Sequence, residues 1–235
     1  MATIQTKPAR RNSSVTESRR TLADGVIKRI RQEIISGWLA PGIMVAEIPT
    51  AQRLNVSRVP VREAMIVLEH DGLLEFEENG RCRVRTLTAR DFAEIYSVRL
   101  MLETESFRLA ALNHTDADLK SLRDCIRQME RARSLSRVTL LDIEFHDRIM
   151  EMSRQSRLMY LWKIMRSQIQ LFTAILQREL SSVITSVRDV SVEAHLTCLR
   201  DVESGAPERA GQCAIEHLEP WSEWLKATRS EGGAI

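Results

Sequence analysis

Apolar residues recur at helical spacing along almost the whole sequence, and one short segment around Asn79-Gly80 interrupts this pattern. Asn-Gly between two extended runs is a strong signal for a β-hairpin, because both residues tolerate a positive φ. We therefore predict two short strands at residues 73–77 and 81–85. Elsewhere the spacing favours helices over strands, so the chain is expected to be a mainly α protein with one small hairpin.

Three predicted helices precede the hairpin. The first covers residues 22–37, and a short one follows at residues 50–54. A tight turn then leads into a helix at residues 57–70, with Ser57 as its N-cap. The order of helix, helix, turn, helix and hairpin predicts a winged helix-turn-helix at residues 21–87.

The sequence from Thr88 onward shows helical patterns alone. Thr88 with Asp91 and Thr115 with Asp118 resemble capping boxes, in which Asp takes the place of the usual Glu or Gln. We expect residues 88–235 to form an antiparallel all-helical bundle. Its predicted helices cover residues 89–113, 115–134, 138–153, 156–180, 186–204 and 207–228.

Composition narrows the class of protein. Charged residues make up 28% of the chain, and no apolar run is long enough to cross a bilayer, so we expect no transmembrane helix. The first 20 residues have no apolar segment of the secretory type, and we predict a disordered basic arm at residues 1–20. The four cysteines lack CxxC spacing, which favours a reduced, cytoplasmic protein over a disulfide-linked or zinc-finger protein.

The predicted helix after the tight turn carries groups suited to reading DNA. Arg58 and Arg62 lie four residues apart and so share one face, and Ser57 offers a hydroxyl at the helix start. In helix-turn-helix proteins these first residues reach base edges in the major groove, where an arginine pairs with guanine. The alternative is a solvent-facing helix whose arginines pair with glutamates of the same helix.

Charge is unevenly distributed, in the direction that DNA binding requires. Residues 1–85 carry 14 basic against 10 acidic residues, a net charge of +4. Residues 86–235 carry 20 against 22, a net charge of −2. The difference is a weak indication that the N-terminal part meets a polyanion.

Four titratable residues fall inside the apolar stripes of the predicted bundle. Asp142 and His146 stand at i and i+4 on one helix, and His195 and His217 lie on two later helices. An unpaired buried polar group costs about 1–3 kcal/mol, so a shared partner would stabilise all four. One carboxylate and three imidazoles suit a divalent metal ion, with zinc as the first candidate and nickel or manganese as others. The alternative is that each histidine is a core residue with its own hydrogen-bond partner.

Arg99 also faces the predicted core, on the same stripe as Tyr96. A buried guanidinium needs an anion nearby. Glu103, four residues further on, can supply one as an internal ion pair. The carboxylate of a bound effector is the other possibility, because arginine pairs with carboxylates through two parallel hydrogen bonds.

A dense set of motif residues runs through the predicted helix-turn-helix: Ile35-x-Gly37-x-Leu39-x-Pro41-Gly42, Glu47, Ala51, Leu54, Val56-Ser57-Arg58-Val59-Pro60-Val61-Arg62-Glu63-Ala64 and Leu68-Glu69-x-Asp71-Gly72-Leu73. With these residues, the sequence over residues 22–88 resembles the DNA-binding domain of the GntR family of bacterial transcription regulators. The resemblance implies a homodimer that binds a palindromic operator, with contacts from Ser57, Arg58, Val59 and Arg62 and from Gly80 in the wing. Val59 stands where threonine is usual, and Asn55 replaces the usual turn glycine.

The helical region contains the motifs Glu94-x-Tyr96-x-x-Arg99-x-x-x-Glu103 and Asp142-x-x-Phe145-His146, followed by His195 and His217. With these residues it resembles the FCD ligand-binding domain of the FadR subfamily. The resemblance implies that Asp142, His146, His195 and His217 hold a metal ion, whose open positions take a small organic acid. It also supports Arg99 and Tyr96 as effector-binding candidates.

We therefore expect a ligand-responsive transcription regulator, in the repressor role, and not an enzyme. The competing hypothesis is a metal-dependent hydrolase or lyase that uses the Asp/His site, since such a site can acidify a bound water. Against it, the sequence has no His-Glu-x-x-His pattern and no second carboxylate clearly placed as a general base.

Overall fold

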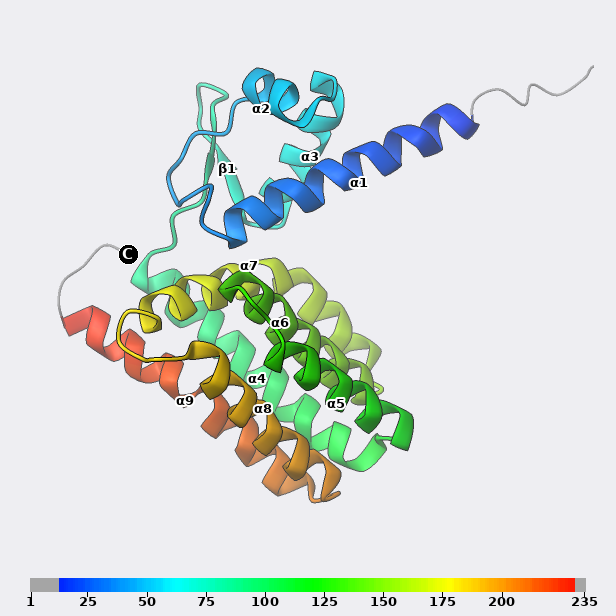
Figure 1. The fold of residues 1–235 in the computed structure, drawn as a ribbon, viewed down its shortest axis with the longest axis vertical. Helices are drawn as coiled ribbons and strands as arrows, with labels where there is room; N and C mark the ends of the chain where they lie inside the picture. The colour runs from blue at the N-terminus through cyan, green and yellow to red at the C-terminus, as the bar shows by residue number, and fades with distance from the viewer. Residues whose placement is uncertain (1–12, 231–235) are drawn as a thin grey trace, which may run out of the picture.

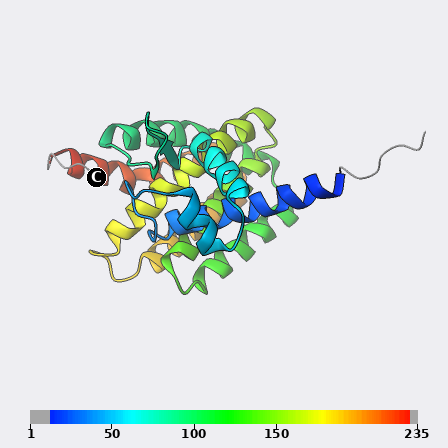
Figure 2. The same cartoon turned by 90° about the horizontal axis from the view of Figure 1, so that it is seen from above.

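The computed structural model describes residues 13–230, which form two lobes stacked along the long axis of the molecule (Figure 1). The N-terminal lobe contains helices α1 to α3 and strands β1 and β2, and the C-terminal lobe contains helices α4 to α9. Seen from above, the N-terminal lobe lies over the helical bundle, and the N-terminal part of its first helix projects beyond the bundle (Figure 2). The mainly α fold, with a winged helix-turn-helix ahead of a helical domain, is thus confirmed.

The N-terminal lobe is built around α1 (Ser13–Ile35), α2 (Glu47–Leu54) and α3 (Arg58–His70). Ile30 and Ile34 of α1 are buried against α3, because their helical spacing places them on one apolar face. Asn55 ends α2 in the left-handed region, with φ 53° and ψ 47°. Asparagine tolerates this conformation, so the tight turn between α2 and α3 forms without the usual glycine.

The hairpin pairs β1 (Leu74–Phe76) with β2 (Cys82–Val84) in antiparallel register, Leu74 opposite Val84 and Phe76 opposite Cys82. Gly80 lies in the connecting turn with φ 77°, the positive value that the Asn-Gly signal predicted. The strands are shorter than the predicted residues 73–77 and 81–85, although cross-hairpin bonds from Arg85 N–H to the Leu73 carbonyl (3.0 Å) and from Glu77 N–H to the Arg81 carbonyl (2.8 Å) continue the same register at both ends.

One prediction for the N-terminus is wrong in part. Residues 1–20 were expected to form a disordered arm, but α1 already begins at Ser13. No proline or glycine interrupts residues 13–20, and extending an existing helix adds one hydrogen bond per residue without a new nucleation cost. Residues 1–12 lie outside the described part of the chain, so the arm prediction is not tested there.

Six helices form the bundle of the described C-terminal lobe, and the predicted ranges agree with them to within a few residues. The capping boxes are also confirmed: Thr88 with Asp91 and Thr115 with Asp118 each make both reciprocal bonds. The helices are α4 (Ala89–Asn113), α5 (Asp116–Glu130), α6 (Leu135–Met152), α7 (Ser156–Leu180), α8 (Val187–Glu203) and α9 (Pro207–Ser230).

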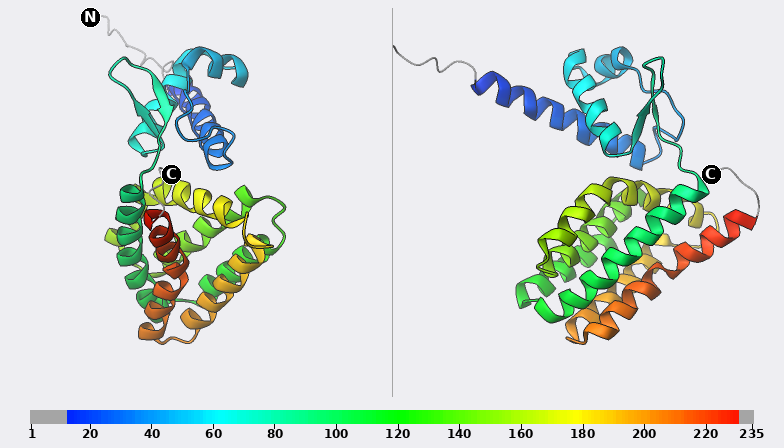
Figure 3. Two further views of the ribbon diagram at one scale, coloured as in Figure 1. Left: turned by 90° about the vertical axis from the view of Figure 1, so that its left-hand side faces the viewer. Right: turned by 180° about the vertical axis from the view of Figure 1, so that it is seen from behind.

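Helices far apart in sequence meet in the bundle. α4 and α9 lie side by side along their length, and α6 contacts α4, α5, α7 and α8 (Figure 3). The N-terminal lobe rests on α7, where Arg178 Nη1 donates to the Ile35 carbonyl over 3.0 Å and Ser167 Oγ donates to Asp71 over 3.3 Å. Among residues 13–230, no helix is both long and apolar enough to pass through a membrane.

Candidate functional site

The structure brings Asp142, His146, His195 and His217 together at one point inside the bundle. Each residue offers one ligand atom, and these atoms all lie within 4.8 Å of one another. Asp142 and His146 come from adjacent turns of α6, because residues four apart share a helix face. His195 arrives from α8 and His217 from α9. We call these four residues the quartet.

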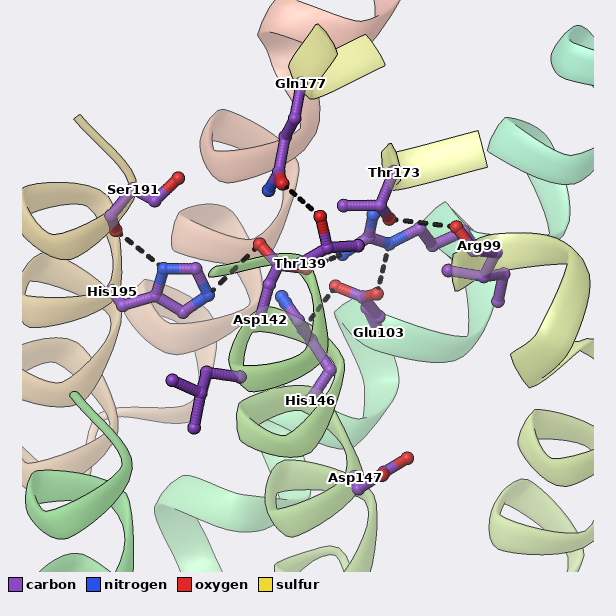
Figure 4. Close-up of polar contacts among 12 residues, drawn as sticks. Arg99, Glu103, Thr139, Asp142, His146, Asp147, Thr173, Gln177, Ser191 and His195 are labelled. Atoms are coloured by element: carbon purple, nitrogen blue, oxygen red, sulfur yellow. Dashed lines mark hydrogen bonds and ion pairs between the residues drawn. The ribbon is translucent and has the colours of Figure 1, made fainter. Parts of the chain in front are cut away.

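Neighbouring groups contact two of the imidazoles at Nδ1 (Figure 4). His195 Nδ1 lies 2.6 Å from the carbonyl oxygen of Ser191, and His146 Nδ1 lies 3.0 Å from Glu103 Oε2. A carbonyl can only accept, so His195 Nδ1 carries the proton and His195 Nε2 keeps its lone pair, as a metal-binding imidazole requires. His146 Nδ1 and Glu103 Oε2 make a close contact without the alignment of a hydrogen bond.

Several polar atoms of the quartet have no hydrogen-bond partner within residues 13–230: His146 Nε2, His195 Nε2, His217 Nδ1 and Asp142 Oδ2. Asp142, His146 and His195 are buried, and His217 is half-buried. An unsatisfied buried polar group destabilises the folded state by about 1–3 kcal/mol, so four such groups in one place are unusual in a core that has only a structural role. The donor set and these orphaned atoms fit a divalent metal ion.

Burial favours the neutral form of two of the imidazoles, those of His195 and His217. Desolvation lowers the pKa of His195 to about 4, although the charge of Asp142 opposes this shift. Desolvation also lowers the pKa of His217 well below its usual value, and the other two histidines of the quartet add to the effect. Neutral imidazole is the form that binds a metal ion, so protons compete weakly for these nitrogens near neutral pH.

Arg99 lies beside the quartet and is fully buried. Its Nε donates to Glu103 over 2.5 Å, which is the internal ion pair considered from the sequence. That pair uses one nitrogen; Nη1 and Nη2 have no hydrogen-bond partner in the described chain, and Nη2 lies 3.9 Å from Asp142 Oδ2. The guanidinium also stacks on Trp221, 4.5 Å from the ring centre. Two donors thus remain available next to the quartet.

Tyr96, the second effector-binding candidate, is half-buried on α4 and packs against the apolar core. Its role in the site stays a prediction.

Sequence reasoning gave Glu103 a single role, as a partner for Arg99. The structure places it between Arg99 and His146, and these two neighbours hold the pKa of its carboxyl at about 2, although burial alone would raise it. Thr139, Thr173 and Gln177 are also buried nearby, and Thr139 donates to Gln177 over 2.6 Å (Figure 4). In the sequence, the signal for a role of Glu103 in the site was its inward position one helical turn after Arg99.

The first turn of α3 forms an exposed basic surface. Arg58 and Arg62 are 64% and 71% exposed, and Ser57 and Val59 are exposed beside them. Ser57 occupies the N-cap position as predicted, but no cap bond from its hydroxyl is found among the described residues. Glu47 at the start of α2 lies 3.0 Å from Arg58 Nη2 and 3.9 Å from Arg62 Nε. Gly80 lies at the hairpin tip with open space around it.

Comparisons with known proteins agree with both lobes. The family model for bacterial regulatory proteins of the gntR family matches residues 22–84, and that for the FCD domain matches residues 94–220. The HTH-type transcriptional regulator YdhC of Bacillus subtilis (strain 168) is 26% identical over 87% of this chain and 91% of its own length. The gluconate operon transcriptional repressor of Bacillus licheniformis is 28% identical over 68% of this chain and 67% of its own.

Solved structures share the fold. The E. coli McbR/YncC structure superposes with a TM-score of 0.73 at 22% identity, over 88% of this chain and 98% of that one. The relatives named here are transcription regulators and not enzymes, so the alternative of a hydrolase or lyase finds no support.

Proposed function

Because the chain belongs to the GntR family of bacterial transcription regulators and carries an FCD domain, we propose that it is a repressor that senses a small carboxylic acid through a metal-centred pocket. The observation that carries this proposal is the convergence of four potential ligand side chains, each with a buried polar atom that has no hydrogen-bond partner in the described chain. The Arg99 guanidinium lies beside them, and two of its nitrogens likewise lack hydrogen-bond partners among these residues. We propose residues 21–87 as the DNA-binding unit and residues 88–235 as the effector-binding and dimerisation unit.

Asp142, His146, His195 and His217 would hold the metal ion, with zinc as the first candidate and nickel or manganese as others. The ion supplies positive charge and open coordination positions for the oxygens of an acid. The Ser191 carbonyl keeps the His195 ring oriented by accepting from Nδ1, and Glu103 lies against the His146 ring, 3.0 Å from its Nδ1. Arg99, already held by Glu103 through Nε, would donate from Nη1 and Nη2 to the acid.

The exposed first turn of α3 would enter the major groove of operator DNA, with Arg58 and Arg62 reaching base edges and Ser57 and Val59 beside them. The wing tip at Gly80 would approach the backbone. A homodimer in the cytoplasm would place two such helices on a palindrome. Effector binding in the bundle would change their spacing, and an operator with fixed half-site separation would lose affinity.

Elemental analysis of the purified protein tests the metal centre. We expect one metal ion per chain in the wild type and a clear loss in His195→Ala. His114→Ala is the matched control, because His114 is half-buried in the same lobe and contacts the Ala110 carbonyl, outside the quartet. Unchanged metal content in His195→Ala would refute the assignment of the quartet.

A thermal-shift screen of organic acids, run with and without chelator, tests the sensing role. Sugar acids come first, because a gluconate operon repressor is among the relatives. We expect an acid to raise the unfolding temperature of metal-loaded protein and to release it from the DNA upstream of its operon. An acid that stabilises chelated protein and Arg99→Gln as strongly as the wild type would contradict the proposed pocket.

A further inference from the structure

A cavity lies between the two lobes, away from the quartet. It has a volume of about 780 Å³ and is lined by the C-terminal half of α1 together with α6 and α7. Figure 1 shows this half of α1 directly over α6 and α7. Among the described residues, none of the quartet contributes to its lining.

Basic side chains line the cavity from both lobes. Lys28 and Arg31 come from α1, Arg137 from the first turn of α6 and Arg166 from α7, and Glu144 is the acidic residue of the lining. Arg31 is paired with Asp71, Arg166 with Asp147, and Glu144 lies 3.8 Å from Arg148. Lys28 and Arg137 have no carboxylate partner among residues 13–230, although Arg137 donates to Gln128 over 3.0 Å. Each lobe therefore contributes to the lining one basic residue without a carboxylate partner among the described residues: Lys28, which is exposed, and Arg137, which is half-buried.

Two further features favour an anion. The lining includes Ser134 and Ser136 at the start of α6, an 18-residue helix, so the positive end of a helix dipole lies at this cavity. Arg31 Nε is a buried donor with no hydrogen-bond partner in the described chain, and an anion would satisfy it. Gln170 is 4% exposed, and its buried Oε1 also has no partner among these residues. This oxygen accepts, so a ligand hydroxyl or a water would satisfy it, and a phosphate oxygen would not.

We propose that this cavity binds a small phosphorylated metabolite, whose phosphate dianion bridges Lys28 of the N-terminal lobe and Arg137 of the bundle. A phosphate monoester concentrates two charges and three acceptor oxygens in one compact group, which matches a lysine, an arginine fork and a helix N-terminus at once. Direct polar contacts between the lobes are few, and Arg178 with Ile35 and Ser167 with Asp71 are two of them. A bound anion would therefore hold the DNA-binding lobe to the bundle, independently of the metal centre.

Calorimetric titration of the full-length protein with glucose 6-phosphate, at fixed ionic strength, tests this site. Uncharged glucose is the ligand control. Losing one charge-assisted contact should weaken binding about tenfold in Lys28→Gln and about tenfold in Arg137→Gln. Lys120→Gln removes an exposed charge on α5 and should leave the affinity unchanged, as should His195→Ala.

Hydrogen exchange gives a second measurement. Glucose 6-phosphate should slow exchange in the C-terminal half of α1 and in the first turn of α6 together. The proposal fails if binding is absent, if glucose binds equally well, or if either pocket variant keeps the wild-type affinity. Loss of binding in His195→Ala would instead assign the anion to the metal centre. Weaker operator binding by Arg137→Gln without sugar-phosphate binding would assign the contact to DNA, and it would also overturn the proposal.

Discussion

The exposed surface of α3 and the buried centre of the bundle both carry ionisable groups, but they hold them in opposite ways. Arg58 and Arg62 are 64% and 71% exposed, and both form solvent-exposed ion pairs with Glu47. Arg99 and Glu103 are fully buried, and Arg99 has two nitrogens without hydrogen-bond partners in the described chain. The charged groups on the surface are therefore solvent-exposed and ion-paired, whereas the centre contains buried polar atoms that have no hydrogen-bond partner in the described chain.

This difference predicts which substitutions change stability and which change binding alone. Water screens the ion pairs on the surface, so their loss leaves the fold nearly unaffected. In the interior, removing one member of a pair leaves its partner buried and unpaired. The following experiments test this contrast, from the largest expected effect to the smallest.

Glu103→Ala should give the largest effect, a loss of about 3–5 kcal/mol in the free energy of unfolding, because it leaves Arg99 buried without its carboxylate. Glu47→Ala is the surface counterpart and should change it by about 1 kcal/mol or less. Urea denaturation of chelator-treated protein measures both. Equal losses in the two variants would remove the contrast between the two regions.

Removing the metal with a chelator should give the second-largest effect, a loss of stability, because a ligand that binds only the folded state stabilises it by mass action. At free metal concentrations of 100 to 1,000 times the dissociation constant, the loss would be about 2.7–4 kcal/mol. Calorimetry with and without chelator measures the shift in unfolding temperature. In His195→Ala the chelator should cause no shift, and a shift as large as in the wild type would place the metal elsewhere.

Arg62→Ala should weaken binding to the operator by about 1–3 kcal/mol while the free energy of unfolding stays unchanged. The matched control is Arg200→Ala, since Arg200 is a similarly exposed arginine on α8, 3.7 Å from Glu193. Fluorescence anisotropy at constant salt gives both affinities, because phosphate contacts depend steeply on ionic strength. Equal affinities for Arg62→Ala and wild type would place the DNA surface away from α3.

Thr115→Ala should give the smallest effect, about 1 kcal/mol in the free energy of unfolding, from the lost cap of α5. The partner carboxylate adds a dependence on pH. Burial opposes ionisation of Asp118, but the bonds from Thr115 and the charge of Arg154 together outweigh it and lower its pKa below the usual value. Its stabilisation is therefore present above the ordinary Asp pKa and disappears as the pH falls through the lowered one.

Denaturation of Asp118→Asn at several pH values measures this dependence. The variant should be less stable than the wild type at neutral pH and should approach it in acid. A constant difference across this range would show that the charge of Asp118 adds nothing to the cap.

Much of the fold could be predicted because its signals are local. The capping boxes at Thr88 and Thr115, the left-handed turn at Asn55 and the hairpin at Gly80 each depend on residues a few positions apart. The start of α1 was mispredicted for the same reason. Polar residues 13–20 carry no apolar period, yet they continue a helix that the following residues nucleate.

The sequence predicted which residues form the candidate site, but it did not predict that they meet at one point. Helical period placed Asp142, His146, His195 and His217 on inward faces, and resemblance grouped them. The spacings of 4, 49 and 22 residues do not specify a common point, since that depends on how α6, α8 and α9 pack. Likewise, the sequence paired Glu103 with Arg99 but gave no sign that His146 would lie 3.0 Å away.

The amino-acid sequence alone determined the secondary structure, the winged arrangement and the inward faces, because hydrogen bonding and apolar periodicity act over one or two helical turns. Tertiary packing decided which inward groups meet, that the Ser191 carbonyl orients the His195 ring, and where a cavity opens between the lobes. These outcomes depend on contacts between helices distant in the chain, and such contacts are set by the close packing of the whole interior.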